Sequence, residues 1–322
     1  VAVRVLVEGG PVGGMDRRQA RLLDELVAAG VAVRVVDGPA ARYRFHHPKY
    51  AVVDDRVLVT SENWGPGGTG GHGTRGGGAV VADATLADRL AAVFHADAGW
   101  RDAKPWRAVR DQEFEAAGPP ANDSFPRRFA ARTLRARSVD LVLAPDNAER
   151  AVRNLVASAD ETLLVAQPRT DADHPFVRAA VAAARRGVTV RILLGSAWYE
   201  REENERTAQR LRAVARREGL DLAVRLVEPR SRFDRLHLKG VVVDREAALV
   251  GSINWNNVSV RENREVALLL RGDPARYYAR VFRADWRGGA WRLPAGALLA
   301  ALLTVLGTAA GAVGGGFWGA IP

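Results

Sequence analysis

The same succession of patterns occurs twice in this chain, about 190 residues apart. Each copy runs from a hydrophobic strand through a helical stretch to a second strand, and closes on nearly the same letters, VFHAD at 93–97 and VFRAD at 281–285. So long a register indicates an internal duplication, and we expect two halves with one architecture. The matched elements are expected at 1–7 and 188–194, 16–29 and 203–218, and 31–36 and 222–227.

The alternation of strand and helix predicts an α/β fold in which each half packs a sheet between helices. We expect the first half over residues 1–103, a connecting segment with a Gly-Pro-Pro sequence over 104–138, and the second half over 139–289. A hydrophobic tail follows over 293–322.

The second half has an opening unit, 141–187, without a counterpart in the first half. Its pattern predicts a helix over 147–158, a strand over 162–167 and a helix over 175–186. This asymmetry predicts that the sequence is an N-terminally truncated piece that lacks the matching unit.

Lysine is rare in this chain. The 47 Lys and Arg residues include only three lysines, and two of them, Lys49 and Lys239, lie in the two copies of one motif. Since arginine supplies positive charge elsewhere, a lysine kept here indicates a need for a compact ammonium with three donors. The first copy contains His47, Lys49, Asp54, Ser61 and Asn63, and the second contains His237, Lys239, Asp244, Ser252 and Asn254.

The motif spacing predicts a hairpin. Side chains at positions i and i+2 of a strand share a face, so each His and Lys pair points the same way. A turn at Asp54 and Asp55 would bring Ser61 and Asn63 back beside the first pair, and the second copy has nearly the same spacing. Asp54 and Asp244 would then be structural. Paired imidazole, ammonium, hydroxyl and amide groups indicate a site for a phosphate ester.

These residues resemble the signature of the phospholipase D superfamily, H-x-K-x4-D followed by G-S-x-N. Residues 237–254 match it in full, whereas 47–63 have Thr60 in place of the glycine and a loop one residue shorter. The resemblance covers residues 1–288. It implies a duplicated α-β-α sandwich whose two pseudo-symmetric halves share one active site at their interface. It also implies no metal, no cofactor and no need for a second chain.

The resemblance further implies a mechanism. One histidine attacks phosphorus and forms a phosphohistidine, while the other protonates the leaving alcohol and then activates water or an acceptor alcohol. The remaining polar groups would hold the phosphoryl oxygens. These groups are Lys49, Lys239, Ser61, Asn63, Ser252 and Asn254.

In the family an acidic residue downstream of each motif histidine orients the histidine of the opposite half. Glu265 fits this role and would support His47, which makes His47 the expected nucleophile and His237 the general acid. The matching place in the first half, 74–77, contains no acid. Glu62 and Asp83 are the candidates to replace it.

Several other features have a structural and a functional interpretation. The glycine-rich segment 65–78 is expected to be a mobile loop at the mouth of the site, where His72 could touch substrate. We expect Trp64 and Trp255 to pack in the core, with lining of the pocket as the alternative. We expect His46 to be structural. His95 and His174 are expected on or beside helices without ligand partners.

The charge and the tail leave the location of the protein open between alternatives. A net charge of +10 attracts phosphate-bearing partners, but it also fits arginines spread over exposed helices. The tail contains no charged residue and is long enough for a membrane anchor, although a buried packing helix is the alternative. If the tail is an anchor, the arginines before it favour the cytoplasmic side for the catalytic halves, but the sequence does not determine the side.

The sequence therefore predicts a phosphodiesterase or transferase that acts on phospholipids, including head-group exchange of the cardiolipin synthase kind. One alternative is a nuclease of the same superfamily that cleaves DNA or RNA. The other is a non-catalytic scaffold that binds phosphate, for which the missing acid and Thr60 are the only support.

Overall fold

The computed structural model describes residues 1–11, 14–38, 41–118, 123–125, 128–227 and 232–288. Residues Val1–Trp286 form one compact unit. The expected tail at 293–322 lies outside the described residues. Within the described ranges no helix is both long and apolar enough to span a bilayer.

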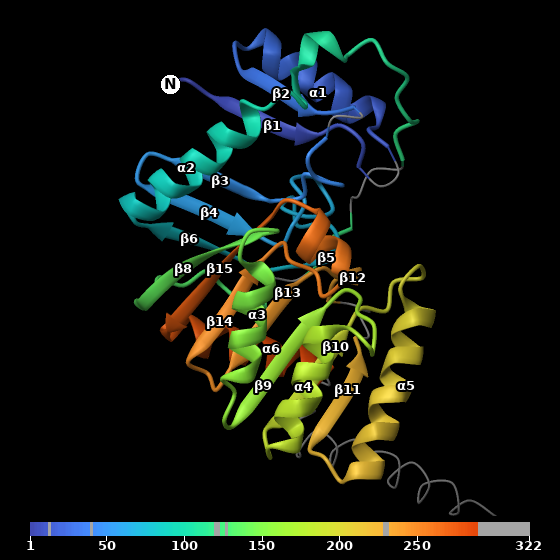
Figure 1. Ribbon diagram of the computed structural model, residues 1–322. Coiled ribbons are helices and arrows are strands. Elements are labelled where there is room, and N and C mark those ends of the chain that lie inside the picture. The colour runs from blue at the N-terminus through green and yellow to red at the C-terminus, as the bar shows by residue number, and fades with distance from the viewer. Residues whose placement is uncertain (12–13, 39–40, 119–122, 126–127, 228–231, 289–322) are drawn as a thin grey trace, which may run out of the picture. The chain divides into compact units, whose positions relative to one another are not determined.

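The second half is built on one seven-stranded sheet with the order β11-β10-β9-β13-β14-β15-β8 (Figure 1). The strands β9, β10 and β11 are parallel, and the others run antiparallel to their neighbours. The strand bounds are β8 Ala136–Ala144, β9 Thr162–Gln167, β10 Thr189–Leu194, β11 Leu222–Leu226, β13 Lys239–Val243, β14 Ala247–Gly251 and β15 Glu265–Gly272.

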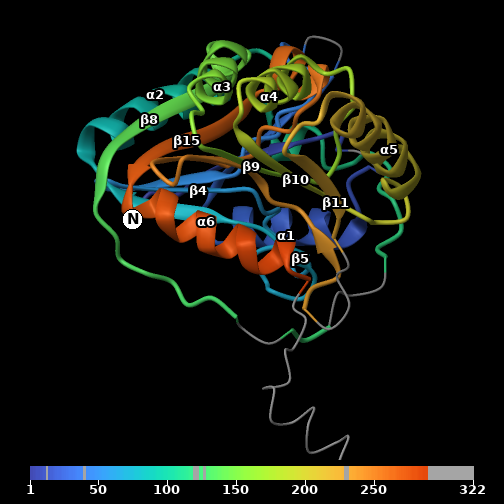
Figure 2. The same cartoon turned by 90° about the horizontal axis from the view of Figure 1, so that it is seen from below.

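Helices cover both faces of this sheet. Figure 2 shows α3 (Ala148–Ala157), α4 (Pro175–Arg185) and α5 (Arg201–Glu218) on one side and α6 (Asp273–Trp286) on the other. The strands alternate accordingly, because their apolar side chains divide between a core under α3, α4 and α5 and a second core under α6. The predicted α-β-α layering is confirmed.

The first half has two smaller sheets instead. One contains β1 (Arg4–Glu8), β2 (Ala32–Val36) and β7 (Ala103–Pro105), and α1 (Arg17–Ala28) packs on it. The other contains β3 (Tyr50–Val53), β4 (Arg56–Thr60) and β6 (Gly78–Ala82), and α2 (Ala84–Ala98) packs on it. This second sheet shares its apolar core with β15 and β8 of the second half.

The described part of the first half has no counterpart of β9, and its sheet is divided at that place. In the second half β9 lies between β10 and β13 and joins them. The corresponding strands of the first half are β1 and β3, and no strand of the described residues lies between them.

The expected connecting segment, 104–138, begins within a strand. Strand β7 pairs with β2, so Lys104 belongs to the first-half sheet. The short helix η1 (Trp106–Ala108) follows, and Trp106 is buried against that sheet.

Candidate active site

Two hairpins present the motif residues. The strands β3 and β4 are joined at Asp54 and Asp55, as predicted, and β13 and β14 form the matching pair. Each lysine folds back onto the carbonyl oxygen of its own histidine. Lys49 Nζ donates to His47 O at 2.6 Å, and Lys239 Nζ donates to His237 O at 2.8 Å. The local geometry is therefore the same in both copies.

Each histidine segment is paired with the opposite half. The backbone N of His47 donates to Arg264 O at 3.0 Å, and that of His237 donates to Arg75 O at 2.9 Å. In the second case the short strands β12 (Arg235–Leu236) and β5 (Thr74–Arg75) run side by side. These reciprocal bonds bring both motifs to the interface of the two halves.

The same two arginines form reciprocal ion pairs. Arg264 Nε lies 3.0 Å from Asp97 of α2, and Arg75 Nε lies 2.8 Å from Asp285 of α6. Both carboxylates are almost fully buried. They are the last residues of the repeated sequences VFHAD (93–97) and VFRAD (281–285). Buried, hydrogen-bonded pairs of this kind fix geometry, and they hold the two halves in register. Sequence reasoning missed these pairs, although both arginines directly precede the expected position of the family acid.

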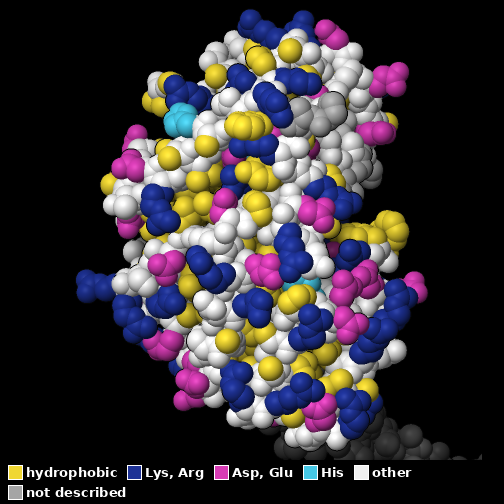
Figure 3. Space-filling model, in the orientation of Figure 1, with side chains coloured by type: hydrophobic (Ala, Val, Ile, Leu, Met, Phe, Trp, Pro, Cys, Tyr) yellow, Lys and Arg dark blue, Asp and Glu magenta, His cyan; other side chains and the backbone are white. Residues whose placement is uncertain are grey.

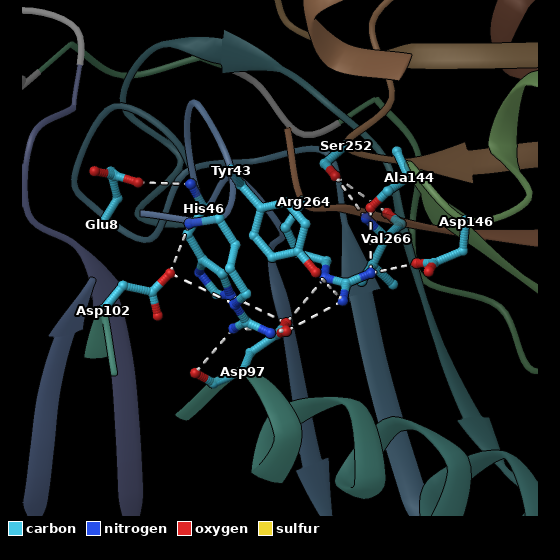
Figure 4. Close-up of polar contacts among 11 residues, drawn as sticks. Glu8, Tyr43, His46, Asp97, Asp102, Ala144, Asp146, Ser252, Arg264 and Val266 are labelled. Carbon is cyan, nitrogen blue, oxygen red and sulfur yellow. Dashed lines mark hydrogen bonds and ion pairs between the residues drawn. The ribbon is translucent and has the colours of Figure 1, made fainter. Parts of the chain in front are cut away.

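Figure 4 shows the cluster around Arg264, whose backbone O accepts from His47 N. Asp97 also lies 3.4 Å from His46 Nε2, and the ring of Tyr43 stacks on the Arg264 guanidinium. The backbone N of His46 donates to Glu8 at 2.6 Å. The expectation that His46 is structural agrees with these contacts.

His47 is held by the predicted acid. Its Nδ1 lies 2.8 Å from Glu265 Oε2, and Glu265 is fully buried at the start of β15. The other carboxylate oxygen accepts from Ser259 Oγ at 2.7 Å and from Asn263 Nδ2 at 3.0 Å. A carboxylate at Nδ1 fixes the tautomer in which Nε2 carries a lone pair. Sequence reasoning missed Ser259 and Asn263, which position the acid.

Burial lowers the pKa of His47, and Glu265 only partly offsets this effect. Burial also raises the pKa of Glu265, but the nearby His47 and Lys49 hold it below its ordinary value. The stable pair near neutral pH is thus a neutral imidazole beside a carboxylate, which suits a nucleophile.

His237 has a looser partner. Its Nδ1 lies 3.8 Å from Glu62 Oε2, too far for a direct hydrogen bond. Burial and the charge of Lys239 lower the pKa of His237 to about 4. Asp83, the other candidate acid, instead caps α2 by accepting from Leu86 N at 2.9 Å.

The two lysines are the buried cations of the site. Lys49 is 8% exposed and Lys239 is 2% exposed. Burial lowers their pKa values to about 8 and about 7, and for Lys239 the charge of Lys49 adds to the effect. Lys49 also lowers the pKa of His237, and Lys239 lowers that of His47. Together with the reciprocal backbone bonds, these mutual effects indicate that the two motifs lie close together, and two lysines side by side would favour a bound anion.

The expected phosphate ligands differ in their surroundings. The hydroxyl of Ser61 accepts from Gly77 N at 3.0 Å, and that of Ser252 accepts from Val266 N at 3.0 Å. Both serines are fully buried, and these bonds connect them to the backbone of the neighbouring segments. Asn254 is half-buried, whereas Asn63 is exposed. Phosphate binding by these four side chains stays a prediction.

The two motif aspartates differ as well. Asp244 accepts three backbone N–H bonds at 2.7–2.9 Å from residues 160–162, which begin β9. Asp54 is exposed and accepts no side-chain hydrogen bond from the described residues. Asp244 thus fixes the start of β9, and the expected structural roles of both aspartates stay predictions.

The two tryptophans behave oppositely. Trp255 is fully buried, with its ring centroid 5.5 Å from that of Phe176 on α4. Trp64 is 59% exposed, so the expectation that it packs in the core is wrong. The first half lacks a described counterpart of α4, and Trp64 has no such helix to pack beneath.

The expected loop at 65–78 contains the short strand β5. His72 is exposed, and its Nδ1 lies 2.7 Å from Asp123 O. His95 lies within α2, and His174 caps the start of α4. The described residues contain no group of three or more potential metal ligands.

Comparison with known proteins identifies a family. The family described as "Cardiolipin synthase, PLD-like domain" matches residues 1–98 and 152–286, which together are most of the chain. "Cardiolipin synthase 2" of Bacillus anthracis is 31% identical over 146 residues, which are 44% of this chain and 27% of that protein. The chain thus spans about a quarter of the length of that curated relative.

Two solved structures share the fold along most of the chain. Phosphatidylserine synthase of Haemophilus influenzae superposes with a TM-score of 0.62 and 16% identity, and the match covers 90% of this chain and 73% of that one. Polyphosphate kinase of Porphyromonas gingivalis gives a TM-score of 0.55 and 13% identity, over 89% of this chain and 38% of that one.

Proposed function

Because this chain belongs to the phospholipase D superfamily, we propose that it is a metal-independent phosphodiesterase or phosphatidyltransferase that acts on phospholipids through a phosphohistidine. The observation that carries the proposal is the hydrogen bond between His47 Nδ1 and Glu265. This bond leaves the lone pair of His47 on Nε2, beside two buried lysines. No second chain is needed in this proposal, since both motifs come from one chain.

In the first step His47 Nε2 forms a bond to phosphorus while the bond from phosphorus to the alcohol oxygen breaks. His237 gives a proton to that oxygen, so the alcohol leaves neutral. In the second step His237 takes a proton from an acceptor alcohol or water. The acceptor oxygen attacks phosphorus and releases His47.

The lysines stabilise the negative charge that develops on the phosphoryl oxygens. Their lowered pKa values describe the site without an anion. A bound phosphodiester favours the charged form of both lysines, and it raises the pKa of His237 from about 4 for the same reason. Substrate would therefore help to load the proton that His237 donates.

A phospholipid is the preferred substrate class. The matching family is described by cardiolipin synthase, and the fold likeness to a phosphatidylserine synthase covers 90% of the chain. Figure 3 shows the face that is seen in Figure 1. On this face Lys and Arg side chains are scattered among Asp and Glu, without the continuous basic band typical of nucleic-acid binding. The net charge of +10 fits anionic lipid and nucleic acid alike, so it does not favour a nuclease over a lipid enzyme.

The test uses the full chain in EDTA with phosphatidylglycerol vesicles and, in parallel, plasmid DNA. The control is His47→Asn. Released head group or cardiolipin that disappears in the variant supports the proposal. DNA nicking with intact lipid would assign a nuclease instead, and no product from either substrate would favour the scaffold alternative.

A further inference from the structure

We propose that Glu62 is the positioning carboxylate of His237, and that it fills from strand β4 the place that Glu265 fills from strand β15 in the other half. The inference deepens the proposed function and rests on it. Gly76 is the first-half position that corresponds to Glu265. If Glu62 supplies the carboxylate, position 76 must carry no side chain, and glycine meets that requirement.

Strand register establishes which positions correspond. Thr60 pairs with Gly78 in the first half, and Gly251 pairs with Ala267 in the second. One residue further on, each serine N donates to the opposite strand at 2.9 Å, Ser61 to residue 77 and Ser252 to residue 266. Counting one more residue aligns Gly76 with Glu265 and Glu62 with Ile253. In the second half the acid lies at the start of β15 and faces an isoleucine. In the first half the acid follows β4 and faces a glycine.

The space at Gly76 supports this exchange. A Cβ atom built there would lie 1.5 Å from Glu62 Oε1, 2.2 Å from its Cδ and 2.4 Å from its Cγ. These are the three nearest atoms, so the Glu62 carboxylate occupies the volume that a side chain at position 76 would need. Gly76 does not have a left-handed φ, and the backbone alone therefore does not require glycine.

A second exchange accompanies the first. The first half has Thr60 opposite Gly78, whereas the second half has Gly251 opposite Ala267. The hydroxyl of Thr60 accepts from Glu62 N at 3.1 Å and donates to Gly77 O at 3.2 Å. Thr60, which departs from the family signature, thus fixes the backbone of the relocated acid.

The surroundings of Glu62 suit a positioning acid. It is 8% exposed, and its Oε2 accepts from Thr74 Oγ1 and lies 3.8 Å from His237 Nδ1. Its Oε1 and His237 Nδ1 are buried without a hydrogen-bond partner among the described residues. Active-site hydrogen bonds often tighten only when substrate binds, and a small shift would join these two groups.

The test is a rescue series that compares Glu62→Gln, Glu62→Ile and the double variant Glu62→Ile with Gly76→Glu. The double variant gives the first half the residues that the second half has. We expect each single change at position 62 to lower kcat by about 10–100-fold with little change in KM, as for loss of a residue that orients a catalytic ligand. The double variant should recover at least tenfold over Glu62→Ile. Gly76→Glu alone should be impaired, because Glu62 fills its space.

A second readout does not depend on turnover. The charged groups that face His237 are Lys239, Lys49 and Glu62, and of these Glu62 alone raises the pKa of His237. In NMR titrations of the free protein, Glu62→Gln should lower the pKa of His237, and the double variant should restore it. Failure of the lipid assay with these shifts intact would count against the proposed function only. An unchanged His237 titration, or a double variant no better than Glu62→Ile, would overturn the role of Glu62. Glu62→Gln keeps the side-chain shape, so its titration decides the matter if the isoleucine variants unfold.

Discussion

The two halves carry the same motif, yet only the second half holds it in a continuous sheet. The two lysines keep the same geometry in both halves, since each bonds the carbonyl of its own histidine. Residues that face away from the site do not. Asp244 and Trp255 contact the opening unit of the second half, whereas Asp54 and Trp64 are exposed. The comparison separates the motif residues that serve chemistry from those that serve packing.

The histidine–acid pairs differ in tightness. Glu265 lies 2.8 Å from His47, while Glu62 lies 3.8 Å from His237. A fixed imidazole suits the attacking histidine, and a looser one suits the histidine that must gain and lose a proton.

The tryptophans should show the greatest contrast in stability. Trp255→Ala should lower the free energy of unfolding by about 3–5 kcal/mol, because it opens a cavity beneath α4. Trp64→Ala should stay within about 0.5 kcal/mol, since the side chain is exposed. Urea denaturation of both variants measures the difference. Equal losses would mean that Trp64 has a packing partner after all.

The three lysines provide a matched series for activity. Lys239→Met and Lys49→Met should each lower kcat by about 10²–10³-fold, as for the loss of one group that stabilises transition-state charge. Lys104→Met is the control, because Lys104 pairs with Asp37 away from the site. Head-group release from vesicles is the measurement. A comparable loss in the control would show that the effect is not specific to the site.

Stability should fall on acidification. The pKa of His237 is about 4 in the folded protein, below its ordinary value of 6.5. The unfolded chain therefore binds this proton first as the pH falls, and stability declines between about pH 6.5 and 4, by on the order of 2 kcal/mol. Denaturant midpoints at pH 7.5 and 4.5 should show a smaller difference in His237→Asn than in the wild type. An identical difference in both would contradict the assigned burial.

The aspartates should show the smallest contrast. Asp244→Asn keeps the side-chain size but replaces one of the two carboxylate oxygens that together accept from three N–H groups, and should cost about 1–2 kcal/mol. Asp54→Asn should be nearly neutral. Thermal unfolding of both variants tests the comparison, and the prediction fails should Asp54→Asn cost as much as Asp244→Asn.

Short-range patterns predicted much of the site. The i and i+2 spacing and the turn at Asp54 fix the hairpin locally, and the resemblance placed Glu265 beside His47. The exposure of Trp64 could not be predicted from its own motif, because Trp255 is buried against α4 and the described part of the first half has no counterpart of that helix. The pairs of Arg264 with Asp97 and Arg75 with Asp285 join distant segments, so no local spacing reveals them.

The position of Glu62 was harder to interpret. Its neighbours in sequence match those of Ile253, which is buried and apolar. Only the strand register shows that Glu62 and Gly76 have exchanged the roles of two facing positions. A sequence motif fixes the order of residues along one strand, but it does not state which residue lies across from it.

The proposed mechanism depends on a covalent phosphohistidine that forms on His47 in the first step. The measurement is rapid quenching of His237→Asn with phosphatidyl-p-nitrophenol, whose leaving group needs no proton from His237, followed by mass spectrometry of the peptides that contain the two histidines. The account predicts a phosphatidyl adduct on His47 that accumulates, because His237 is absent to activate the acceptor. In the wild-type protein, an adduct on His237, or product formation without any adduct on His47, would contradict it.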